Sequence, residues 1–102
     1  MNKQEMIDEI MDWFEFEKVH KVMEDLDWTW VSVGTRVPTL QDLRSSARRE
    51  LHLAYDGLEK HGGDNYFTGS GGFFASAHKL QNGKVSLSLK FAVSDWTAGD
   101  EE

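Results

Sequence analysis

The sequence contains no cysteine. Disulfide frameworks, thiolate metal sites and cysteine nucleophiles are therefore all excluded. It also lacks any apolar run that approaches the roughly 20 residues of a membrane-spanning helix. Its N-terminus is polar and acidic, without the apolar stretch of a secretory signal, so we expect a cytoplasmic protein with no membrane partner.

Catalytic motifs are also missing. His20 and Glu24 have a spacing that permits a metal pair, but no HxxxH or HExxH motif accompanies them. Ser70 lies in a glycine-rich stretch before a predicted strand, whereas a nucleophile elbow joins a strand to a helix. We therefore expect no enzyme, no cofactor and no metal site.

The chain has 102 residues, which suits one domain, and its 12 % aromatic content argues against disorder. Its formal charge is -7, and residues 1–30 carry nine acids against three lysines. Nucleic-acid backbones repel such a surface, so we expect no direct nucleic-acid binding. An acidic surface serves either solubility or the recognition of a basic partner.

Two apolar patterns of helical spacing occupy the N-terminal part, and they are out of phase. The first comprises Ile7, Ile10 and Phe14, and the second comprises Phe16, Val19, Met23 and Leu26. Either two helices meet near residues 14–16 or one helix changes its buried face, and we favour the break. The predicted organisation is an appended acidic helix (1–13), one domain (14–97) and an acidic tail (98–102).

A long helix is predicted from Thr39 to about Lys60. Thr39 suits the N-cap, with Asp42 three residues later as a short capping box. The apolar stripe comprises Leu40, Leu43, Ala47, Leu51, Ala54 and Leu58. Gly57 is a weak point in the helix interior, costing about 1 kcal/mol relative to Ala.

Two strands are predicted at about 73–80 and 84–96, joined by Asn82-Gly83. A two-residue turn and a three-residue turn with a bulge are both possible. We favour the latter because it places Phe73, Ala75 and Ala77 on the apolar face. With residues 28–31 as a third short strand, the expected fold is α+β: two or three helices packed on a small antiparallel sheet. Residues 62–72 are interpreted as a flexible glycine-rich connection.

Four residues around the predicted helix break form a candidate protein interface: Asp12, Trp13, Glu15 and Glu17. Trp13 either packs into the core or is exposed, and an exposed tryptophan among carboxylates is a good interface anchor. The alternative is a small-ligand site for a nucleotide signal, formed by Arg44, Arg48, Tyr66 and the glycine-rich loop. Open sheet edges also favour a homodimer.

The segments together resemble a group of small bacteriophage proteins, most of which have no assigned activity. The resemblance spans roughly residues 14–96 and runs through Phe14–Met23, Leu26–Trp30, Val37-Pro38-Thr39, Gly71-Gly72-Phe73, Ala75, Leu87-Ser88-Leu89 and Phe91. It is a pattern of structural residues without a catalytic motif. The resemblance implies a phage origin, a life in the host cytoplasm and, by analogy, a protein that modulates or inhibits a host protein, including host defence.

Overall fold

The computed structural model describes residues 2–91 and the backbone of 97–99. In chain order its elements are α1 (Lys3–Trp13), α2 (Phe16–Asp25), a 3-10 helix η1 (Val31–Val33), α3 (Leu40–His61), β1 (Asn65–Ser70), β2 (Phe73–Lys79), β3 (Val85–Phe91) and β4 (Thr97–Gly99). The part of the predicted second strand beyond Phe91 that includes Trp96, and the predicted tail beyond Gly99, lie outside the described residues.

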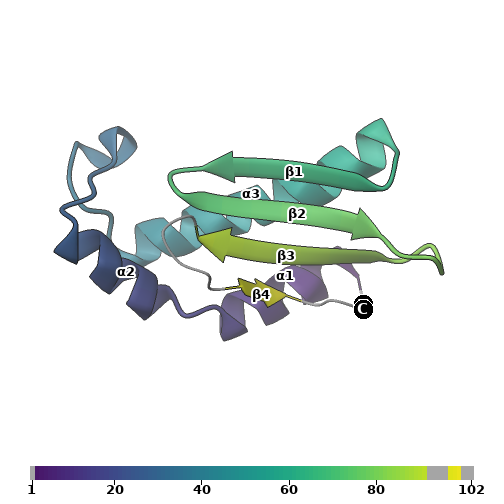
Figure 1. Cartoon of the computed structure of the whole chain (residues 1–102), viewed down its shortest axis with the longest axis horizontal. Coiled ribbons are helices and arrows are strands. Elements are labelled where there is room, and N and C mark those ends of the chain that lie inside the picture. Colours follow the sequence, from purple (N-terminus) through teal and green to yellow (C-terminus); the bar gives the residue numbers. More distant parts are fainter. Residues whose placement is uncertain (1, 92–96, 100–102) are drawn as a thin grey trace.

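The strands form one antiparallel sheet in the order β1-β2-β3-β4. Helix α3 runs behind β1 and β2, and α1 lies behind β3 and β4 (Figure 1). The predicted α+β class is therefore confirmed. One face of the sheet carries the helices, and the opposite face has no helix on it among the described residues.

The buried apolar side chains of the described residues form one hydrophobic core between the helices and the sheet. Alternation along β2 and β3 directs Phe73, Leu89 and Phe91 into this core. Helix α1, which the sequence predicts as an appended segment, shares the same core through its buried residues Met6, Ile7, Ile10 and Met11.

The predicted helix boundaries agree with the structure. The chain breaks between α1 and α2 at residues 14–15, where Phe14 has extended backbone angles. Thr39 and Asp42 form the predicted capping box of α3, with each side chain accepting a backbone N–H from the other residue. The predicted three-residue turn is also present, because the Leu80 N–H donates to the Lys84 carbonyl across residues 81–83.

The predicted third strand is wrong. Residues 28–31 contribute only an isolated bridge between Trp30 and Arg36, and the chain then enters η1. The strand beside β2 is instead β1, in the segment interpreted as a flexible connection. Gly71 and Gly72 both have positive φ, as a type I′ two-residue turn requires, and they join β1 to β2 directly.

The same two glycines explain where the tryptophans go. A Cβ on Gly71 would lie 2.7 Å from the Trp30 ring, and one on Gly72 would lie 2.9 Å from the Trp28 ring. The Trp30 indole N–H also donates to the Gly71 carbonyl at 3.2 Å. Side-chain packing onto this turn, rather than strand pairing, therefore accounts for the aromatic pattern of residues 28–30.

Gly57 lies inside α3 because there is no space there for a side chain, a constraint that helix propensity does not reveal. A Cβ on Gly57 would lie 2.1 Å from the ring of Tyr66 on β1. Gly57→Ala should therefore lower the free energy of unfolding by about 1–3 kcal/mol through overpacking, although Ala is the better helix former. Chemical denaturation measures this change. In a Tyr66→Ala background the same substitution should become neutral or stabilising, and equal destabilisation in both backgrounds would contradict the packing explanation.

Candidate functional site: an acidic corner and a polar pocket

The α1–α2 junction exposes the candidate interface residues. Trp13, the last residue of α1, is 74 % exposed, so of the two alternatives for this residue the structure shows the exposed one. Asp12, Glu15 and Glu17 are also exposed. These four residues span only five steps of chain, so their Cα atoms lie within about 18 Å of one another. We call this group the acidic corner.

Buried aromatic rings hold the corner in place. Phe14, between Trp13 and Glu15, lies 5.0 Å from the ring of Phe16 and 6.0 Å from that of Phe73 on β2. These contacts fix the chain on both sides of the junction to the sheet. The backbone that carries the exposed indole is therefore held by the core, so a partner would not have to fold this segment on binding.

The acids of the corner differ in their pairing. Glu15 pairs with Lys18 at 3.1 Å, whereas Asp12 and Glu17 form no ion pair with any described residue. Elsewhere on α1, Asp8 accepts from Arg48 at 3.0 Å, and this bond, with a second from Gln4, lowers the pKa of Asp8. Within the corner, Asp12 and Glu17 are thus the carboxylates available to an outside partner.

The three residues of the alternative ligand site do not converge. Arg48 is engaged by Asp8, and the Arg44 guanidinium lies over the Phe16 ring, 5.0 Å from its centroid. Tyr66 packs against Gly57 and stacks on His61 at 5.4 Å. Because Gly57 is nine residues beyond Arg48 on α3, the tyrosine is about 14 Å farther along the helix.

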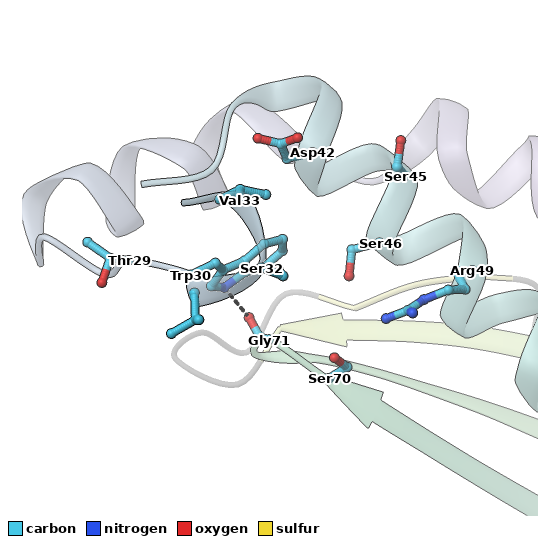
Figure 2. A pocket seen from close by; sticks show the side chains of 11 residues that line it. Thr29, Trp30, Ser32, Val33, Asp42, Ser45, Ser46, Arg49, Ser70 and Gly71 are labelled. Carbon is cyan, nitrogen blue, oxygen red and sulfur yellow. Dashed lines mark hydrogen bonds between the residues drawn. The ribbon is translucent and has the colours of Figure 1, made fainter. Parts of the chain in front are cut away.

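A different pocket, of about 540 Å³, lies between α3, residues 29–33 and the β1–β2 turn. Arg49 extends from α3 into it, and Ser46 and Ser70 face the same space (Figure 2). Sequence reasoning did not assemble this set, because it depends on the β1–β2 hairpin that was missed. The only signal was the proximity of Arg49 to Arg44 and Arg48 in the sequence.

Among the described residues, the pocket is lined by hydroxyl groups and one guanidinium, and these do not form a recognisable catalytic arrangement. None of its serines is hydrogen-bonded to a histidine or carboxylate within the described part of the chain, so no activated nucleophile is present there. Arg49 itself lies 3.5 Å from the buried carboxylate of Glu50. Across residues 2–91, no three His, Asp or Glu side chains cluster as metal ligands would.

Asp42 borders this pocket and links stability to pH. The backbone N–H of Thr39 donates to its carboxylate at 2.9 Å, and this bond, with help from Arg36, lowers the pKa of Asp42. Since folding favours the charged form, its contribution is complete above the unfolded pKa of about 4 and is lost as the pH falls through the folded value. Asp42→Asn should therefore flatten the loss of stability between about pH 4 and pH 2. Urea unfolding at several pH values tests this, and an unchanged slope would contradict it; Glu59→Gln, on an exposed helical site, is the control.

No helix in the described part of the chain is long and apolar enough to cross a membrane. No protein-family model, no curated protein and no solved structure matches the chain.

Proposed function

We propose that the chain is a non-catalytic binding protein that engages a partner protein through the acidic corner. The observation that carries this proposal is the exposure of Trp13 at a junction where the nearby rings of Phe14 and Phe16 are buried. Tryptophan is among the residues most enriched at binding hot spots, where it fills a pocket of the partner. We therefore propose that the exposed Trp13 side chain inserts into a pocket on the partner protein.

The charges around Trp13 indicate what kind of surface the partner would have. Asp12, Glu15 and Glu17 place carboxylates around the indole, so the complementary surface is an apolar recess ringed by lysine or arginine. Opposite charge raises the association rate and fixes the orientation of docking. On the resemblance to bacteriophage proteins, we propose that this partner is a host protein that the chain modulates or inhibits, with a defence protein as the favoured class.

Capture from bacterial lysate tests the proposal. We expect Glu15→Lys/Glu17→Lys to weaken capture of a stoichiometric partner by at least about tenfold, because like charges would then face each other. Glu59→Lys/Asp64→Lys makes the same change in net charge on exposed residues far along the chain, and it should leave capture intact. The bound fraction is measured by quantitative mass spectrometry.

The salt dependence gives a second readout. Raising the ionic strength from about 0.05 M to 0.5 M should weaken the complex, since exposed charges are screened. Equal capture by both charge-reversal variants would contradict the role of the corner. Recovery of a nucleotide without any protein would instead favour the small-ligand alternative, with Arg49 and the pocket as its new location.

A further inference from the structure

Strand β1 is an open edge of the sheet. It pairs with β2 on one side, and no described residue pairs with its other side. The Lys79 N–H donates to the Asp64 carbonyl at 2.9 Å, which fixes the alternation of the ladder. Tyr66, Thr68 and Ser70 therefore bond toward β2, while Asn65, Phe67 and Gly69 direct their backbone N–H and C=O groups outward.

This edge lacks the features by which proteins usually prevent strand pairing. Edge strands are normally protected by charged side chains, proline or a bulge. In β1 none of the residues from Asn65 to Ser70 is charged, although 28 % of the whole chain is, and the register with β2 is regular. In a molecule of charge -7, two copies can meet along this uncharged strip without setting carboxylates of β1 against each other.

Exposed apolar side chains flank the edge on both faces of the sheet. On the outer face Phe67 is 67 % exposed. On the helical face Leu53 is 48 % exposed, and its spacing places it on the same side of α3 as Glu50 and Gly57. That side of α3 lies over β1, because Thr68 donates to the Glu50 carbonyl and the Tyr66 ring packs on Gly57.

We propose that two copies of this chain join through their β1 strands, antiparallel about a two-fold axis at Phe67. In this register Phe67 faces its counterpart, and Asn65 of each copy faces Gly69 of the other. Each of these three pairs uses the outward backbone groups of both residues, and each makes two hydrogen bonds. The arrangement is self-complementary, as a two-fold interface requires.

The joint covers side chains as well as backbone. The two Phe67 rings become a cross-strand aromatic pair on the outer face, and the two Leu53 side chains approach on the helical face. The edge is at the side of the sheet opposite α1, so the acidic corners remain free (Figure 1). A dimer would thus present two corners, although its formation does not depend on the proposed function.

Sedimentation over a concentration series tests the interface. We expect the wild-type mass to rise from 11.7 kDa toward twice that value, and to do so more readily at high salt, because screening reduces the repulsion between acidic copies. Phe67→Pro removes an outward N–H and an exposed ring but no hydrogen bond to β2, so it should keep the fold by circular dichroism but remain monomeric. Phe74→Ala, which alters an exposed ring on the neighbouring strand, is the matched control and should still dimerise.

A single cysteine tests the register and remains informative if the proline variant misfolds. The chain has no cysteine of its own. The Cα atoms of a hydrogen-bonded antiparallel pair lie about 5.5 Å apart, within disulfide range. Phe67→Cys should therefore crosslink on mild oxidation while Phe74→Cys should not. A wild type that stays monomeric, or a dimer whose Phe67→Cys variant crosslinks no faster than Phe74→Cys, overturns the proposal.

Discussion

Phe73→Ala is expected to lower the free energy of unfolding by about 3–5 kcal/mol. Phe73 is fully buried and lies at the centre of an aromatic cluster, 6.1 Å from the ring of Phe16 and 5.2 Å from that of Phe91. Its removal leaves a cavity between α2 and the sheet that the surrounding rings can fill only in part. Since domains of this size are stable by about 5–15 kcal/mol, the variant should be close to unfolding at body temperature.

Denaturant unfolding of Phe73→Ala and Phe74→Ala shows whether the loss of stability comes from removing a buried side chain or from removing any aromatic ring. The two residues are neighbours in β2, but Phe74 is 51 % exposed on the outer face. Phe74→Ala should therefore cost less than about 1 kcal/mol. A larger loss for Phe74→Ala than for Phe73→Ala would mean that the register of β2 is shifted by one residue.

Trp13→Ala has the largest effect expected on binding. A tryptophan that fills a recess at the centre of an interface contributes about 2–4 kcal/mol, which corresponds to a loss of roughly 30- to 1000-fold in affinity. The side chain contributes little to folding because it is exposed, so the stability of the variant should stay within about 0.5 kcal/mol of wild type. Binding and unfolding are thus expected to respond separately to this substitution.

Helices were predictable from the sequence because their signals are local. The capping box at Thr39 and the apolar stripe of α3 lie within one segment, and both were found in the structure. The break before α2 followed from a change of phase between two such stripes. The hairpin register was also predictable, because only one register gives β2 and β3 a common apolar face.

Strand β1 was missed because its signal is not local. Tyr66 and Thr68 face α3, but their partners Gly57 and Glu50 lie earlier in the chain and have no pattern of their own. Gly71 and Gly72 form the hairpin turn, and they also leave space for the rings of Trp30 and Trp28. Composition alone suggests a flexible segment instead. Gly71-Gly72 before a strand was nevertheless a usable hairpin signal.

Some features of the candidate site were likewise predictable from local sequence, and others required the folded structure. The acidic residues at 12, 15 and 17 could be placed on the surface from charge alone, whereas the exposure of Trp13 depends on how Phe14 and Phe16 pack. The pocket around Arg49 required the position of the β1–β2 turn, which only the folded chain supplies. The separation of Tyr66 from Arg44 and Arg48 could not be predicted, because the contact of Tyr66 with Gly57 has no signal in the sequence.

The most direct test of the central claim compares Trp13→Ala with Val31→Ala for binding to the captured partner. Both substitutions truncate an exposed apolar side chain, and Val31 lies in η1, away from the acidic corner. Titration calorimetry should show that Trp13→Ala weakens binding at least about 30-fold while Val31→Ala binds as the wild type does. If Trp13→Ala binds with wild-type affinity, the acidic corner is not the binding site.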